Sequence, residues 1–81
     1  MSKNVTLIEY PEATILKSYE TFVAIKPLRT DFMVTEEYYS KTTSRHINDF
    51  FGGSEKTTQI KKVSQKEINT LAKFLEAYHN G

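Results

Sequence analysis

Side chains that can hold an anion or a carbonyl-rich surface are concentrated in one segment, residues 38–48. Besides two tyrosines, the segment carries four aliphatic hydroxyls, two cations, an imidazole and an amide. Apolar residues recur at helical spacing at its end, so these groups stand at the start of an expected helix. The first turn of a helix offers free backbone N–H groups and a partial positive charge. The pattern predicts a binding site rather than a reaction.

The hydroxyls of this segment exceed what a helix cap needs. Thr42, Thr43 or Ser44 can each cap the helix, yet all three are present and are followed by Arg45 and His46. Cations in a first turn also oppose the helix dipole, and such local costs are expected at functional sites. The alternative is that the hydroxyls only cap the helix and the cations are solvated. The expected contact residues are Tyr39, Lys41, Thr42, Thr43, Ser44, Arg45, His46 and Asn48.

The aromatic residues divide between the core and the surface. Tyr38 and Tyr39 are adjacent in an extended segment and face opposite ways, so one is expected to be buried. The other is then free to stack on a base, a sugar or a partner side chain. Phe50, Phe51 and Phe74 lie on apolar helical stripes and are expected in the core.

Catalysis is not indicated by these residues. Ser44 and His46 are two positions apart, so on a helix they point in different directions, and His79 is close to the C-terminus. A serine distant in the sequence could still meet His46. Since the sequence shows no set of nucleophile, base and orienting acid, we expect no enzyme activity and no cofactor.

Metal binding also has little support in the sequence. His46 with Asp49, and Glu76 with His79, are each one helical turn apart, but two ligands are fewer than a catalytic zinc needs. The absence of cysteine excludes thiolate sites. The glycine-rich stretch at residues 52–56 lacks the Walker spacing and is expected to end a helix. We therefore expect no metal site.

Charge is unevenly distributed along a chain of net charge +1. Residues 1–40 carry four Lys or Arg against six Asp or Glu, and residues 41–81 carry seven against four. A cationic face would make nucleic acid the alternative partner, although dedicated nucleic-acid domains are usually far more basic. The residues that would form this face are Lys41, Arg45, Lys61 and Lys62.

Five segments rich in β-branched and aromatic residues predict strands. The third has a continuous apolar centre, which indicates a central strand that is covered on both faces. The fifth is polar and is expected at a sheet edge, where lysines oppose aggregation. The expected strands are residues 5–10, 13–19, 21–26, 32–35 and 57–63.

Two helices complete the predicted fold. A short helix of about two turns carries Ile47, Phe50 and Phe51 and ends at Gly52. A capping box at residues 64–67 starts a terminal helix. One face of this helix is expected to be lined by Ile68, Leu71, Ala72, Leu75 and Ala77 or Tyr78. The order β-β-β-β-α-β-α predicts one α+β domain over residues 1–81, an antiparallel sheet of about five strands with both helices packed on one side.

No apolar run is long enough to span a bilayer, and residues 1–5 lack the apolar core of a signal peptide. We expect a soluble cytoplasmic protein without membrane contact.

The central motifs resemble a family of small uncharacterised domains encoded by bacteriophages and other mobile elements. Residues 18–25 read SYETFVAI, residues 34–40 read VTEEYYS and residues 42–48 read TTSRHIN. The family pattern is a strand S-Y-x-T-x-V-A, then V-T, then Y-S-x-T-T-S-R/K-H-I-N, a polar strand and a terminal helix, and it covers about residues 18–75. Phe22 stands where the family pattern has proline. The resemblance implies a small phage protein that acts on the host and brings no established chemistry.

Small non-enzymatic phage proteins often act by stoichiometric binding. We therefore expect a counter-defence protein, such as an anti-CRISPR-type inhibitor, in the cytoplasm of the host cell. Its partner would be a host defence protein or complex, with a nucleotide ligand or nucleic acid as alternatives. The oligomeric state stays open at this point.

Overall fold

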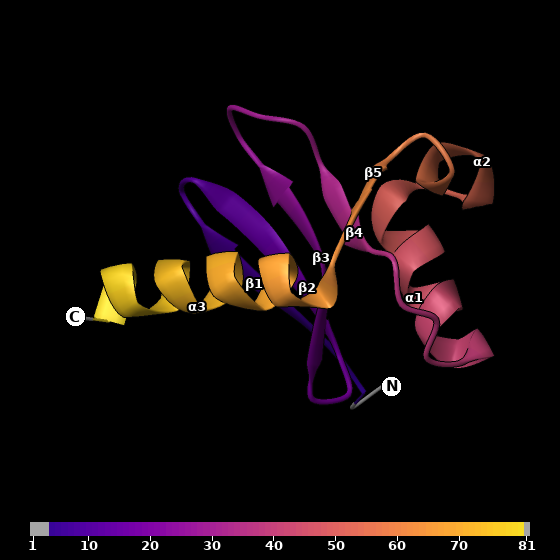
Figure 1. Cartoon of the computed structure of the whole chain (residues 1–81), viewed down its shortest axis with the longest axis horizontal. Helices are drawn as coiled ribbons and strands as arrows, with labels where there is room; N and C mark the ends of the chain where they lie inside the picture. Colours follow the sequence, from indigo (N-terminus) through magenta and orange to yellow (C-terminus); the bar gives the residue numbers. More distant parts are fainter. Residues whose placement is uncertain (1–3, 81) are drawn as a thin grey trace.

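Residues 4–80 are described by a computed structural model, and residues 1–3 and 81 of the expected domain lie outside the described part. The α+β class and a single five-stranded sheet are confirmed (Figure 1). No helix within the described residues has the length and apolar character needed to cross a membrane. The elements are β1 (Val5–Tyr10), β2 (Ala13–Ser18), β3 (Thr21–Pro27), β4 (Met33–Thr35), α1 (Lys41–Phe51), α2 (Ser54–Thr57), β5 (Lys61–Val63) and α3 (Gln65–Asn80).

The sheet has the strand order β1-β2-β3-β4-β5 and is mixed rather than wholly antiparallel. β1 to β4 form an antiparallel meander joined by short connections. β5 pairs with β4 in parallel, in contrast to the expectation from the sequence. The chain leaves β4, passes through α1 and α2 and returns to the beginning of β4, and such a crossover makes the next strand parallel. β5 lies at an edge, as predicted.

The sheet divides the apolar core into two clusters. Ile15 and Ile25 pack against α3 on one face, whereas Leu16 and Ala24 pack against α1 on the other. Val23 is an extra residue on β3, because Leu16 pairs with Ala24 and the next pairing joins Lys17 to Phe22. This bulge lets Val23 and Ala24 both belong to the α1 cluster.

The helices thus lie on opposite faces of the sheet, whereas the sequence analysis placed both on one side. Figure 1 shows α3 and α1 on either side of the strands. The physical reason is the buried apolar run of β3, which needs a cover on each face. Phe74, expected in the core, is exposed on α3 because Ile68, Ala72 and Leu75 occupy the side that faces the sheet.

The predicted fifth strand is shorter than expected, because residues 54–57 form α2. The hydroxyls of Thr57 and Thr58 donate to the carbonyls of Gly53 and Glu55, at 3.0 and 2.7 Å, and so complete this helical turn. Gly52 ends α1 as predicted, with φ +94° and its N–H donating to Asn48 O.

The last turn of α3 is fastened to the turn between β1 and β2. His79 Nε2 lies 2.6 Å from Glu12 Oε1, and its ring stacks on Tyr10 with centroids 4.4 Å apart. The hydrogen bond with His79 is the main cause that holds the pKa of Glu12 below its ordinary value of 4.5.

Replacement of Glu12 by Gln is expected to lower the melting temperature slightly at neutral pH and to have no effect in acid. Because the folded-state pKa of Glu12 is depressed, its contribution to stability is present above pH 4.5 and disappears as pH falls through the folded-state pKa. Thermal unfolding of wild type and E12Q over this range measures the difference, with Glu76→Gln on α3 as the control. A difference that persists in strong acid would contradict this assignment.

Candidate functional site

The first turn of α1 is capped by Ser40, two or more positions before the residues expected from the sequence. Ser40 has extended backbone angles, φ −168° and ψ 168°, and its Oγ accepts from the Thr43 N–H at 3.1 Å. The helix therefore begins at Lys41 and runs for eleven residues rather than two turns. None of Thr42, Thr43 and Ser44 is used as the cap.

A chain of hydroxyls and one imidazole joins α1 to the hairpin formed by β2 and β3. Thr43 is 4% exposed, and its Oγ1 lies 3.3 Å from Ser40 Oγ and 3.0 Å from Ser18 Oγ. Ser18 ends β2, is 2% exposed, and its Oγ lies 2.9 Å from His46 Nδ1. Every buried side-chain polar atom of the described residues has a partner. This hydroxyl–imidazole chain fixes the position of the α1 start.

Ser18 is the distant serine that meets His46, but the pair is not arranged as a catalytic dyad. Ser18 is almost wholly buried, so its Oγ offers very little surface to a substrate carbonyl. Within residues 4–80 no carboxylate is hydrogen-bonded to the His46 ring to orient it as a base. The same part of the chain brings no three His, Asp or Glu side chains together around a possible metal. The pair therefore positions α1.

A hollow of about 390 Å³ opens where the β2–β3 hairpin meets the start of α1. Tyr39 borders it, and its hydroxyl donates to Gln65 Oε1 of α3 at 2.7 Å. Burial, and then the nearby charge of Glu37, raises the pKa of Tyr39, so its phenol is neutral at physiological pH. The wall of the hollow is formed by Ser18, Tyr19, Thr21, Val23, Tyr39, Ser40 and Thr43.

Tyr19 also borders this hollow and has an uncommon backbone conformation. It has φ +57°, the only positive value among the described residues other than glycine. A side chain at positive φ costs about 1–2 kcal/mol relative to glycine. The ring is 46% exposed and lies 6.2 Å from the His46 ring, centroid to centroid. Strain of this kind is a feature of functional positions.

The expected contact residues are distributed around α1 rather than gathered on one face. Thr43 and His46 turn toward the sheet, whereas Ser44 and Asn48 border a second hollow beside β4 and Lys62. Some of the expected contact residues are exposed near the start of α1. Together with Tyr19, we name them the Tyr–Arg surface. It consists of Tyr19, Tyr39, Lys41, Thr42 and Arg45.

Both tyrosines before α1 are exposed, although one of them was expected to be buried. Tyr38 is 70% and Tyr39 is 45% exposed. The segment between β4 and α1 is not a strand, so the alternation of faces that applies to strands does not hold there.

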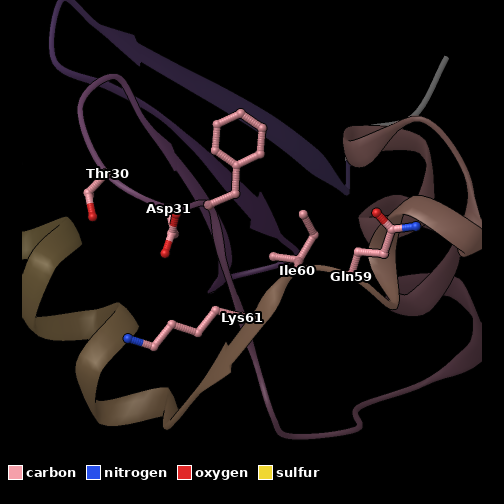
Figure 2. Close-up of a pocket in the computed structure, with 6 residues that line it drawn as sticks. Thr30, Asp31, Gln59, Ile60 and Lys61 are labelled. Atoms are coloured by element: carbon pink, nitrogen blue, oxygen red, sulfur yellow. The ribbon is translucent and has the colours of Figure 1, made fainter.

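The cations of the nucleic-acid alternative lie at separate places. Lys61 and Lys62 are neighbours on β5 and point to opposite faces of the sheet. Lys61 borders a hollow of about 500 Å³ with Thr30 and Asp31 (Figure 2), whereas Lys62 borders the hollow beside Ser44. The four cations, two on β5 and two on α1, therefore do not form one continuous face.

Ser18 and Tyr19 are the residues of this site that the search for candidate residues missed. They lie more than twenty positions before α1, and only the fold brings them together with it. A signal was available, because Ser18 and Tyr19 open the SYETFVAI motif.

The chain belongs to a family of unknown function, DUF8033, whose sequence model matches residues 1–70. The matched range includes all five strands, α1, α2 and the first turns of α3. No curated protein and no solved structure matches the chain. The family brings no activity, so function is argued from the geometry of the site.

The neighbouring threonines of α1 offer a matched test of the hydroxyl–imidazole chain. Thr43→Val preserves shape but removes two side-chain hydrogen bonds, one to Ser18 and one to Ser40, which is expected to cost about 1–3 kcal/mol of unfolding free energy. Thr42→Val at the exposed position should change it by less than about 0.5 kcal/mol. Urea unfolding measures both. Equal effects of T43V and T42V would show that the buried hydroxyl does not hold α1 in place.

Proposed function

We propose that this DUF8033 protein is a non-enzymatic phage counter-defence protein that binds a host defence protein through its Tyr–Arg surface. In this role the protein acts as an anti-CRISPR-type inhibitor, which blocks an immune complex by binding to it. The observation that carries the binding role is the pair of partly exposed tyrosines, Tyr19 and Tyr39, which border one hollow at the start of α1, the helix that also carries Arg45. The similarity of the SYETFVAI and TTSRHIN segments to phage-encoded domains supports the phage origin.

The composition of the Tyr–Arg surface is that of a protein interface. Tyrosine and arginine are enriched where most of the binding energy of an interface is concentrated. Tyr19 and Tyr39 border the same hollow, into which a partner side chain can insert. Arg45 lies one helical turn from Thr42 and presents a planar fork of donors that suits carboxylate groups.

The support beneath the Tyr–Arg surface reduces the entropic cost of binding. Thr43 and His46 are hydrogen-bonded to Ser18, and Tyr39 is hydrogen-bonded to Gln65 of α3. A surface held in this way loses little conformational freedom when a partner arrives, which favours affinity. The buried hydroxyl–imidazole chain is in this view the foundation of a recognition surface.

The charge of the chain favours a protein over nucleic acid as the partner. The net charge is +1, and the lysines of β5 point to opposite faces of the sheet. Binding to nucleic acid depends on several cations acting on one phosphate backbone and falls steeply with salt. The Tyr–Arg surface instead combines aromatic rings, a hydroxyl and two cations.

The chain contains a second arginine, Arg29, which is exposed between β3 and β4 and provides a matched control. Arg45→Glu is expected to weaken partner binding by about 2 kcal/mol or more, roughly 30-fold, whereas R29E should leave it unchanged. The measurement is affinity capture from bacterial lysate with and without nuclease, followed by titration of the captured protein. In bacteria carrying a defence system, phage plating should rise with wild type and R29E but not with R45E.

Two results would contradict the proposed function. Capture that disappears with nuclease would assign the surface to nucleic acid, and equal capture by R45E and R29E would place the interface elsewhere. A large rise in melting temperature with a nucleotide would instead indicate ligand sequestration.

The strained tyrosine gives a second prediction. Tyr19→Gly relieves the positive φ and is expected to raise the unfolding free energy by up to about 1 kcal/mol while weakening partner binding. Chemical unfolding and titration of the captured partner measure the two effects on the same preparation. Loss of stability together with unchanged binding would mean that the Tyr19 ring serves packing alone.

A further inference from the structure

The outer side of β1 presents a row of backbone groups that no strand of the described chain covers, since β1 lies at the edge of the sheet. The Tyr19 N–H donates to Asn4 O, which shows that the even-numbered residues of this strand direct their backbone groups toward β2. Backbone groups alternate in direction along an antiparallel strand. The N–H and C=O groups of Val5, Leu7 and Glu9 therefore point outward.

Beside this edge, the apolar cover of the sheet is incomplete. Leu7 is 52% exposed, although it pairs with the buried Leu16 of β2. A hollow of about 190 Å³ lies between β1 and α1, and Phe50 forms part of its wall. Val5 and Leu7 line the same hollow, so the unpaired edge and the apolar hollow are continuous.

The two edges of the sheet differ in their protection against pairing with another chain. β5 has three residues, and its exposed Lys61 and Lys62 would meet the same lysines of a second copy. β1 has six residues, and Glu9 is its one charged side chain. Lysines on an edge prevent pairing, whereas a long apolar edge invites it. The pattern singles out β1 as the edge open to pairing.

We propose that two copies of this chain form a two-fold dimer by antiparallel pairing of their β1 strands, centred on Leu7. Directly opposed residues of an antiparallel pair have their side chains on the same face of the sheet. A two-fold axis perpendicular to the sheet must therefore lie between one residue and the same residue of the second copy. With Leu7 at the axis, Leu7 opposes its counterpart and Val5 opposes Glu9. All the outward backbone groups then find partners, and no like charges face each other.

This register is better than the one centred on Ile8. An axis at Ile8 would bring Val5 opposite Pro11, which has no N–H to donate. Pairing of β1 with β5 of another copy would be heterologous and would generate a ring or an open filament rather than a two-fold dimer. The register at Leu7 closes the assembly and buries both copies of the exposed leucine.

Dimerisation in this register has a consequence for the proposed binding role. A two-fold axis perpendicular to the sheet keeps the equivalent faces of the two copies on the same side. Both α1 helices therefore lie on one face of a continuous ten-stranded sheet. The two Tyr–Arg surfaces then face in the same general direction. The dimer would present two binding surfaces to a partner with repeated subunits, and avidity would strengthen such binding.

Sedimentation equilibrium across a concentration series tests the dimer. Wild type is expected to shift from 9.4 kDa to about twice that mass as concentration rises. Leu7→Lys places two cations at the axis and should raise the dissociation constant about 100-fold or more, whereas Leu28→Lys, at a more exposed leucine, should leave it unchanged. A wild type that stays monomeric, an L7K protein that still dimerises, or species larger than a dimer would overturn the proposal.

A cysteine variant tests the register without depending on the tolerance of L7K. The chain has no cysteine, so Leu7→Cys introduces a single thiol at the axis. Directly opposed residues of a hydrogen-bonded pair have Cα atoms about 5.5 Å apart, within the range of a disulfide. Mild oxidation should convert L7C to a covalent dimer much faster than L28C. Equal rates for the two variants would rule out this arrangement.

Discussion

Burial of β3 from both sides is the constraint on which the rest of the structure depends. Val23, Ala24 and Ile25 have no exposed surface, so a chain of 81 residues must supply a covering layer for each face of its sheet. α3 supplies one layer and α1 the other. Because the chain is short, the two helices do not cover the whole area of the sheet. The outer strand β1 keeps Leu7 half exposed, and the hollows lie at the margins of the layers.

The polar contact between α1 and the β2–β3 hairpin determines how the helix is oriented on the sheet. An apolar contact would hold α1 against the sheet but would leave its rotation less sharply defined. Ser18 meets Thr43 and His46 on successive turns of the helix, and such directional contacts fix both its rotation and its position. Arg45 and Thr42 are presented outward as a result. The Ser18 hydroxyl is buried at this contact and holds the helix to the hairpin.

The sequence predicts the elements better than their arrangement. The stripe of Ile47, Phe50 and Phe51 predicts α1, and Gly52 marks its end, because both signals are local. The apolar run of β3 indicates cover on both faces, but helical periodicity cannot say which face each helix takes. The parallel direction of β5 depends on the path of α1 and α2. The contact of Ser18 with His46 spans 28 positions, and no local pattern predicts it.

Hydrogen–deuterium exchange of the protein, alone and bound to its captured partner, tests the role of the Tyr–Arg surface most directly. The exchange of a backbone amide slows where a partner excludes water and suppresses local opening. The account predicts slower exchange in residues 19–21 and 39–46, with unchanged exchange in residues 27–31 between β3 and β4. Protection confined to residues 27–31, or to the outer face of α3, would contradict it and assign recognition to another surface.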